Sequence, residues 1–289
     1  MADRPLITDG LGFRIAMSVP GVVVTFGLVI FALMLVGILA FRVNDGGMLA
    51  GPLTLANFTA IFTDPLYAII MLRSLWIAGL VTLATVVTAY PVAWYLAFHA
   101  GRRRGLILFL VTLPFWTSYL LRVFAWKIVL AYNGVLNSAM MDLGLWDAPS
   151  NALLNTPATV VVTLAHAYAP FAILPIFVAL QTIPRSYLEA SSDLGATRAQ
   201  IFGRIVLPLS MPGVLAGALV VFVPTLGDYV TPALVGGPGS IMIGNQIQAQ
   251  FGKANDWPFG AALAVSTMLV ILMAMALVRM ANRRWGSRT

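Results

Sequence analysis

The sequence predicts an all-α integral membrane protein with about six transmembrane helices. Of its 289 residues, 60% are hydrophobic and only 9% are charged, whereas a soluble domain carries about 25% charged residues. Charged side chains this scarce cannot cover a globular protein with solvated groups, so lipid must cover much of the surface. Basic residues cluster between the apolar runs, which is typical of a membrane topology signal.

Six segments approach the length of about 20 apolar residues that a helix needs to cross the hydrocarbon core. The first could be a signal peptide, but its apolar run is too long for one and no small-residue cleavage site follows it. We therefore expect it to be retained, within a single transmembrane domain over 1–289. The expected spans cover about 15–41, 70–98, 105–131, 157–180, 207–232 and 257–279.

Two sequence features bear on the expected shape and length of these spans. Prolines lie inside several of them, and kinked helices are tolerated where neighbouring groups satisfy the freed carbonyls. The third span is expected to continue past Arg122 and Lys127 to about Ala131. No internal repeat and no separate soluble domain is visible in the sequence.

The basic residues predict the orientation. With the N-terminus in the cytoplasm, twelve of the 17 Lys and Arg residues face inward, three lie outside or at a helix mouth, and two fall within the third span. Positive charge marks cytoplasmic segments, so we expect both termini and the long loop 181–206 to be cytoplasmic. The same pattern accounts for the formal charge of +7 without a nucleic acid partner.

Signatures of catalysis and cofactor binding are missing. The chain has no cysteine, so disulfides and thiolate metal sites are excluded, and it contains no G-x-x-x-x-G-K-[ST] phosphate loop. His99 and His166 are far apart in the sequence, which disfavours a metal site; His166 is expected to form a hydrogen bond between helices. We expect neither an enzyme nor a bound cofactor.

The loop 181–206 carries two expected short helices. The first covers Tyr187–Leu194 and ends at Gly195, a typical helix terminator. The second covers about Thr197–Val206, and Pro208 then begins the fifth span. Such helices could dock into a groove on a soluble partner or rest on lipid, and the residue pattern alone does not choose between these alternatives.

A sequence signature favours the docking alternative. The loop resembles the cytoplasmic signature of binding-protein-dependent ABC importer permeases, Glu-Ala-Ala, then Gly, then Ile-x-Leu-Pro, with serine in place of the second alanine. The matching positions are Glu189, Ala190, Ser191, Gly195, Ile205, Leu207 and Pro208. The resemblance implies a type I ABC importer permease fold in which this loop supplies the coupling helices that fit the ATPase subunit.

The resemblance also implies partners and a location. They are two ATP-binding subunits that hold ATP and Mg, a second permease of similar fold, a periplasmic binding protein and the lipid of a bacterial inner membrane. The residues expected to contact the ATPase are Glu189, Ala190, Ser191, Asp193, Gly195, Ala196, Phe202, Leu207 and Pro208.

Four further blocks narrow the family. The chain resembles the spermidine/putrescine permeases in L-P-F-W-T-S-Y-L-L-R (113–122), G-V-L-N (134–137), L-V-G-G-P-G-S-I-M-I-G-N (234–245) and D-W-P-F-G-A-A (256–262). This implies half of a translocation pathway for a small cationic solute, most simply a polyamine. An opine or another amino compound is the alternative substrate, and an ion-coupled secondary carrier is the alternative class, although the inverted repeats and broken helices of such carriers are not visible.

One acidic residue at the end of a span is the main pathway candidate. An ionisable group inside a span is costly and is a functional hypothesis by default, so Asp228, with Tyr229 beside it, is expected to guide a cation. Trp116 and Tyr119 are expected to line the pathway and attract the cation to their ring faces. Two alternatives stay open. Asp228 could pair with Arg122, Lys127 or Arg73 as a structural contact, and the aromatic residues could serve only for packing.

Overall fold

The computed structural model describes residues 11–44, 51–150 and 153–286. Within those residues every regular element is a helix, and the one β feature is an isolated bridge between Arg42 and Leu53. The predicted all-α class is therefore confirmed. The chain divides into two compact units, Met1–Asp64 with Ala249–Val270 and Pro65–Gln248 with Ile271–Thr289, so a single domain over 1–289 stays a prediction.

The helices that could cross a membrane match the expected number. Five are long and apolar enough, and a bent pair raises the count to six if it forms one span. The five are Val23–Ala40, Pro65–Phe98, Pro157–Gln181, Arg198–Gly227 and Trp257–Ala276. The first lies in α1 (Leu11–Ala40) and the last in α12 (Trp257–Gly286).

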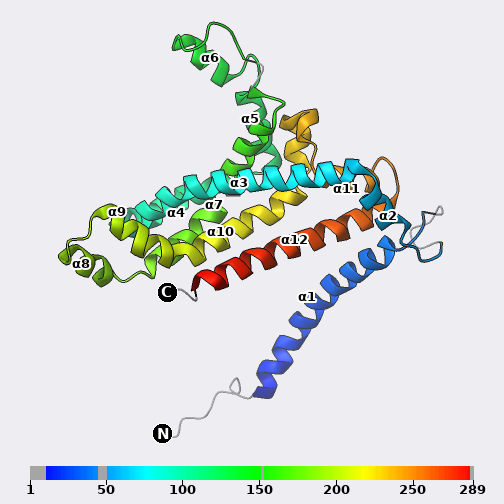
Figure 1. The fold of residues 1–289 in the computed structure, drawn as a ribbon, viewed down its shortest axis with the longest axis horizontal. Helices are drawn as coiled ribbons and strands as arrows, with labels where there is room; N and C mark the ends of the chain where they lie inside the picture. The colour runs from blue at the N-terminus through cyan, green and yellow to red at the C-terminus, as the bar shows by residue number, and fades with distance from the viewer. Residues whose placement is uncertain (1–10, 45–50, 151–152, 287–289) are drawn as a thin grey trace. The chain divides into compact units, whose positions relative to one another are not determined.

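The core of the larger unit consists of three helices that run side by side (Figure 1): α3 (Pro65–Phe98), α7 (Pro157–Gln181) and α10 (Leu207–Gly227). Small residues let α10 approach α7 closely, as is usual between helices in membranes. A Cβ atom added at Gly217 would lie 3.2 Å from the Cα of Ala172. Any larger side chain there would push the two helices apart.

The third span is broken, which contradicts the expected continuous helix over 105–131. After the short turn η2 (Gly101–Arg103), α4 (Arg104–Thr112) and η3 (Leu113–Trp116) lead to an extended Thr117 and Ser118, and α5 (Tyr119–Val129) then leaves at 90°. The guanidinium of Arg122 donates hydrogen bonds to the carbonyl oxygens of Pro114 and Thr117. The hydroxyl of Thr117 also donates to the carbonyl of Pro114 at 2.6 Å, so side-chain donors satisfy backbone carbonyls at the break.

The loop 181–206 also differs from its expected form. It begins with α8 (Arg185–Asp193), and Gly195 follows with φ +80° in the left-handed region that favours glycine. The expected separate helix over Thr197–Val206 is wrong. Instead α9 (Arg198–Ile201) and the π-helical turn η5 (Phe202–Val206) continue directly into α10, so that one helix of 30 residues runs from Arg198 to Gly227.

The fifth span ends earlier than expected. Its helix stops at Gly227, and Asp228 adopts an extended conformation with ψ 123°, whereas the sequence pattern predicted a span to residue 232. The chain then forms η6 (Pro232–Gly236), η7 (Pro238–Ser240) and α11 (Ile243–Phe251). The termination leaves Asp228 in a turn, where its side chain can bind backbone amides.

The smaller unit contains α1, α2 (Ala56–Thr63) and the first part of α12. The amide of Asn57 donates to the carbonyl oxygens of Ala40 (3.0 Å) and Arg42 (2.8 Å), and these bonds tie α2 to the end of α1. Most described side chains of α1 are exposed, including Phe31 at 67%. An apolar helix exposed in this way needs lipid or another protein around it.

Candidate functional site

Asp228 organises the turn that follows α10. Its carboxylate is only 8% exposed, and Oδ1 accepts hydrogen bonds from the backbone N–H groups of Val230 (2.9 Å) and Thr231 (3.3 Å). An acidic side chain that accepts from the second and third following amides is a cap for the helical segment it precedes. The burial of this charge is therefore compensated by backbone donors.

Tyr119, the first residue of α5, completes this cluster. Its hydroxyl donates to Oδ2 of Asp228 and lies 2.5 Å from the hydroxyl oxygen of Thr231. The structure thus brings together two of the predicted pathway residues and adds Thr231, which the sequence analysis did not single out. The D-x-x-T spacing of a capping turn was the signal that could have identified it. We call Tyr119, Asp228 and Thr231 the polar cluster.

The structure does not show the ion pair that was the structural alternative for Asp228. Within residues 11–44, 51–150 and 153–286, no basic side chain forms a salt bridge with this carboxylate. Arg122 instead binds carbonyl oxygens, including that of Ala167 at 3.3 Å, and Arg73 donates to the carbonyl of Pro238 at 3.4 Å. The partners of the Asp228 carboxylate are therefore two backbone amides and a hydroxyl rather than a basic side chain.

The other two predicted pathway residues lie outside the polar cluster. The side chain of Trp116 is 81% exposed at the end of η3, and that of Tyr229 is 46% exposed. Tyr229 contributes its backbone carbonyl, which accepts from the amide of Asn245 at 2.8 Å. Both aromatic rings are free to face a pathway, a partner protein or lipid.

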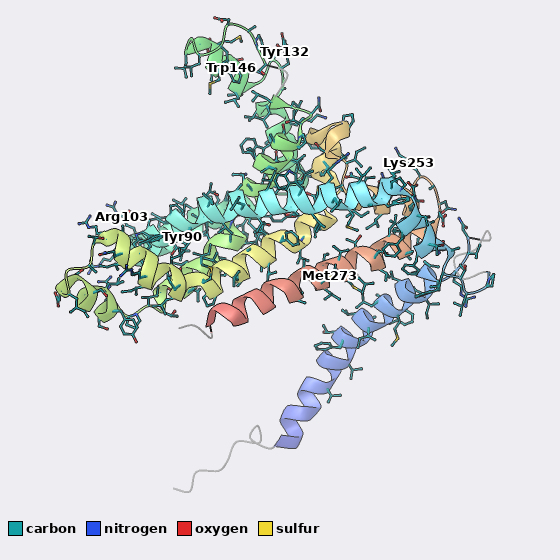
Figure 2. The ribbon with its side chains drawn as sticks, viewed as in Figure 1. Tyr90, Arg103, Tyr132, Trp146, Lys253 and Met273 are labelled. Atoms are coloured by element: carbon teal, nitrogen blue, oxygen red, sulfur yellow. The ribbon has the colours of Figure 1, made fainter. Side chains whose placement is uncertain are left out.

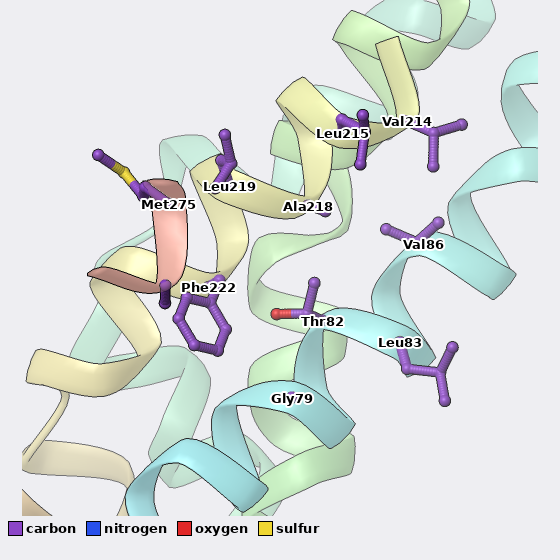
Figure 3. Close-up of a pocket in the computed structure, with 11 residues that line it drawn as sticks. Gly79, Thr82, Leu83, Val86, Val214, Leu215, Ala218, Leu219, Phe222 and Met275 are labelled. Atoms are coloured by element: carbon purple, nitrogen blue, oxygen red, sulfur yellow. The ribbon is translucent and has the colours of Figure 1, made fainter. Parts of the chain in front are cut away.

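A groove of about 340 Å³ lies between α3, α10 and the end of α12 (Figure 3). Thr82 supplies its one side chain with a polar atom. An ammonium group moved into such a groove would lose its hydration without replacement, so this groove does not suit a cationic solute. Its lining residues are Gly79, Thr82, Leu83, Val86, Val214, Leu215, Ala218, Leu219, Phe222, Ala274 and Met275.

The segment 185–208, which was predicted to be cytoplasmic, has most of its side chains exposed. Glu189, Ala190 and Asp193 are exposed on α8, and Leu194 is 89% exposed just before Gly195. Inside the segment, the hydroxyl of Ser191 donates to the carbonyl of Tyr187 at 2.6 Å. The serine that departs from the family signature therefore satisfies its own polar group within α8.

A capping box fixes the turn from α8 into the long helix. The side chain of Thr197 accepts from the amide of Gln200, and the side chain of Gln200 accepts from the amide of Thr197. The turn itself has open space, because a Cβ added at Gly195 would meet no atom within 4 Å. The segment thus holds a defined shape without being packed over by the described part of this chain.

Three of the predicted ATPase-contacting residues lie where the segment meets the core. The ring of Phe202 packs edge-on against Tyr90 (5.8 Å) and Trp94 (5.6 Å) of α3 and is 39% exposed. Leu207 is half-buried and Pro208 is exposed at the start of α10. Phe202 in particular is placed to connect the segment mechanically to α3.

The histidine predicted to join two helices does so. The indole N–H of Trp126 in α5 donates to Nδ1 of His166 in α7 at 3.2 Å. Among the described residues, no group of three or more His, Asp or Glu side chains could hold a metal ion.

The sequence of this chain is similar to those of known transport proteins. Residues 89–287 match the family model for the binding-protein-dependent transport system inner membrane component. The spermidine/putrescine transport system permease protein PotB of Escherichia coli (strain K12) is 39% identical over 246 residues, which cover 85% of this chain and 88% of PotB. PotB of Haemophilus influenzae is 37% identical, with coverage of 88% and 89%.

A third relative and two solved structures agree with this placement. The inner membrane ABC transporter permease protein YdcU of Escherichia coli (strain K12) is 37% identical, with coverage of 93% of this chain and 90% of YdcU. A bacterial ABC transporter for the polysaccharide alginate superposes with a TM-score of 0.68 at 17% identity over 95% of each chain. The alginate transporter complexed with its periplasmic protein gives 0.70 at 18% identity over 93% of each. At such identities the structures establish the shared fold.

Proposed function

This chain belongs to the family of inner membrane components of binding-protein-dependent transport systems, and we propose on that basis that it forms half of the translocation pathway for a polyamine such as spermidine or putrescine. It is the permease subunit of an ABC importer and has no catalytic role of its own. The polyamine assignment is supported by 37–39% identity to PotB proteins along most of the chain. ATP and Mg would be held by the partner ATPase subunits.

The main structural support for the proposal is that one continuous helix joins the segment 185–208 to the polar cluster. It runs 30 residues from Arg198 to Gly227, which corresponds to about 45 Å at 1.5 Å per residue. The hydrocarbon core is only about 30 Å thick, so one end must extend beyond it. The exposed α8 segment adjoins one end of this helix, and Asp228 follows directly at the other.

The continuous helix suggests how a movement caused by ATP binding in the partner subunits would be transmitted to the translocation pathway. When the two ATPase subunits close on each other, the one docked against α8 and Gly195 would move the start of the long helix, and Phe202 would transfer part of that movement to α3. At the far end the same helix positions Asp228. The polar cluster links the Gly227 end of the long helix to α5, which follows the break of the third span. Movement of the long helix would therefore also move α5 at the break. The two movements together would open the pathway toward a periplasmic binding protein.

Asp228 and its neighbours would then guide the substrate rather than store it. The carboxylate of Asp228 is bound by two amides and one hydroxyl, and an ammonium group passing nearby would feel a negative charge at this partly desolvated position more strongly than in water. Its hydrogen-bond positions are largely filled, however, so tight direct coordination is disfavoured. Exposed Trp116 and Tyr229 could offer ring faces to the same cation.

The orientation proposed for this function places both termini and the segment 185–208 in the cytoplasm of a bacterial cell. Basic residues concentrate in those segments. The second permease, the pair of ATPase subunits and the periplasmic binding protein belong to the same proposal. Alginate transporter structures that include a periplasmic protein support partners of this kind.

The test is reconstitution of the co-purified complex in proteoliposomes with labelled putrescine or spermidine. We expect uptake that requires ATP and a polyamine-binding protein. Uptake of an opine instead of a polyamine would favour the alternative substrate class. Uptake by the chain alone, driven by an ion gradient, would favour a secondary carrier. The broken third span is a feature of such carriers that the sequence did not show, but the match to the permease family opposes this alternative.

A further inference from the structure

The first turn of α11 packs against the turn that holds Asp228. This helix covers Ile243–Phe251, and Lys253, labelled in Figure 2, follows its end. A Cβ atom added at Gly244 would lie 2.7 Å from the carbonyl oxygen of Gly227 and 3.0 Å from that of Asp228. Only glycine allows an approach this close. It brings the next side chain, that of Asn245, within reach of the peptide groups that follow Asp228.

One peptide group connects Asn245 with the carboxylate of Asp228. The side-chain NH₂ of Asn245 donates to the carbonyl oxygen of Tyr229 at 2.8 Å. The N–H of the same peptide group belongs to Val230 and donates to Oδ1 of Asp228 at 2.9 Å. The carbonyl has one further donor, the N–H of Ala233 at 3.4 Å. Hydrogen bonds that run through one peptide group polarise and strengthen each other, so Asn245 supports the bond that Asp228 accepts.

The side chain of Asn245 is itself held in one orientation. It is half-buried, and its Oδ1 accepts from the backbone N–H of Met242 at 3.0 Å. This is the backward contact that the third residue of a helix makes in a capping box. Because an amide carries its acceptor and its donors on opposite sides of one plane, the bond to Met242 also fixes the direction in which the NH₂ group points.

The start of α11 is anchored to α3. The backbone N–H of Ile243 donates to the hydroxyl oxygen of Ser74 at 2.8 Å, and that hydroxyl donates to the carbonyl of Ile70 at 2.7 Å. Ser74 and Ile243 are both fully buried. The carboxylate of Asp228 is therefore held from two sides, by Tyr119 of α5 at Oδ2 and, through Asn245, by a helix start that is fixed to α3.

We propose that Asn245 is a positioning residue, which keeps the carboxylate of Asp228 in one place for the passage of a cation. The inference rests on the proposed function, which gives Asp228 that role. Without the NH₂ donor, the peptide group between Tyr229 and Val230 is free to rotate, and its N–H turns away from Oδ1. A charge that occupies several positions guides a cation less well than one held by a supporting shell of hydrogen bonds.

The alternative is that Asn245 only caps α11. A cap contributes to the stability of its own helix, whatever residue stands at position 228. The positioning role instead requires the charge of Asp228, because the bond from Asn245 matters for uptake only if there is a charge to hold. The two roles therefore differ in whether the effect of removing Asn245 depends on Asp228.

A double-mutant cycle in the complete transporter tests this dependence. Asn245→Ala, Asp228→Asn and the double variant are reconstituted in proteoliposomes, and putrescine uptake per assembled complex is measured with saturating loaded binding protein. We expect Asn245→Ala to slow uptake about two- to five-fold, the range of one lost hydrogen bond, at a nearly normal yield of complex. In the Asp228→Asn background it should cause no further slowing.

Gln248→Ala is the matched control, because it removes an exposed amide from the same helix and should leave uptake at the parental rate. Normal uptake by Asn245→Ala, slowdowns that multiply in the double variant, or a yield that falls in proportion to uptake would each overturn the positioning role and leave the proposed function standing. Normal uptake by Asp228→Asn would remove the guiding charge and the role of Asn245 together. Failure of the proposed function itself is distinct, since the parental complex would then show no ATP-dependent polyamine uptake.

Discussion

The polar cluster and the segment 185–208 lie at opposite ends of one helix, and their side chains differ in exposure and in hydrogen-bond partners. At the Gly227 end, the carboxylate of Asp228 is buried and has hydrogen-bond partners within the chain. At the Arg198 end, α8 and Gly195 are exposed, with open space around the turn. The first region has its hydrogen-bond partners within the chain, whereas we propose that the second is contacted by the ATPase subunit.

This difference affects how substitutions at the two ends should be interpreted. A change in the polar cluster alters both the charge of the proposed pathway and the structure of a capped turn, so its effects on uptake and on assembly must be measured separately. A change on the exposed segment should leave the fold nearly intact and act on the partner contact. The following predictions apply this distinction, beginning with the largest expected effect.

Gly195→Trp should abolish transport while the protein stays in the membrane at a normal level. Within this chain the position has room for a side chain, so the tryptophan is obstructed by the docked ATPase rather than by its own fold. ATPase activity stimulated by substrate and binding protein, measured on the reconstituted complex, should fall to the unstimulated rate.

Gly195→Ala is the matched control. It carries the same cost for a non-glycine residue at φ +80°, about 1–2 kcal/mol, without the bulk of the ring. We expect it to retain most of the stimulated activity. Equal losses in the two variants would show that backbone strain, not contact with a partner, explains the effect, and full activity of Gly195→Trp would remove the coupling role.

Asp228→Asn should slow uptake of a polyamine several-fold with a nearly unchanged yield of assembled complex. Asparagine keeps an oxygen that can accept from the amides of Val230 and Thr231, and its NH₂ group can donate to the hydroxyl of Tyr119, so the turn survives while the charge is lost. Uptake rate and complex yield should be measured on the same membranes.

Asp228→Ala provides the structural comparison. It removes the cap, at a cost of about 1 kcal/mol, and deprives the buried hydroxyl of Tyr119 of its carboxylate partner. We expect lower complex yield as well as slower uptake. If Asp228→Asn loses yield in proportion to uptake, the carboxylate is structural, and if its uptake is normal, the charge has no role in the pathway.

The sequence predicted these two regions with different success. The exposed segment follows local rules: small residues favour α8, and a glycine after it marks a left-handed turn. The continuity of Arg198–Gly227 was missed because Pro208 indicated a helix start, whereas η5 leads into Leu207 without interruption. Proline in the first turn of α10 is compatible with both arrangements.

The polar cluster depends on contacts between distant segments, which local patterns do not reveal. Tyr119 and Asp228 were both candidates, but their hydrogen bond requires the 90° break at Thr117 and Ser118. A single proline, Pro114, predicted at most a kink. At the break Arg122 donates to the carbonyl oxygens of Pro114 and Thr117, and Thr117 also donates to Pro114. The sequence did not predict these bonds, because an arginine in an apolar run could equally have extended toward the membrane surface.

The smallest expected effect on activity comes from cysteine probes that test whether the two regions face opposite sides of the membrane. The chain has no cysteine, so each introduced thiol is unique. Gly239 and Lys253 are exposed in segments predicted to lie outside, and Ser186 is exposed on α8. Ser240 would be a poor choice because its side chain is fully buried, and Ser287 lies outside the described residues.

An impermeant thiol reagent added to spheroplasts should label Gly239→Cys and Lys253→Cys but not Ser186→Cys, which should react only after the membrane is opened. The physical basis is the inward bias of Lys and Arg, and transport should be almost unchanged in all three variants because no proposed contact is altered beyond one exposed side chain. Labelling of Ser186→Cys from outside would place α8 on the wrong side for an ATPase, and the proposed transmission from Gly195 to Asp228 would then fail whatever the other variants showed.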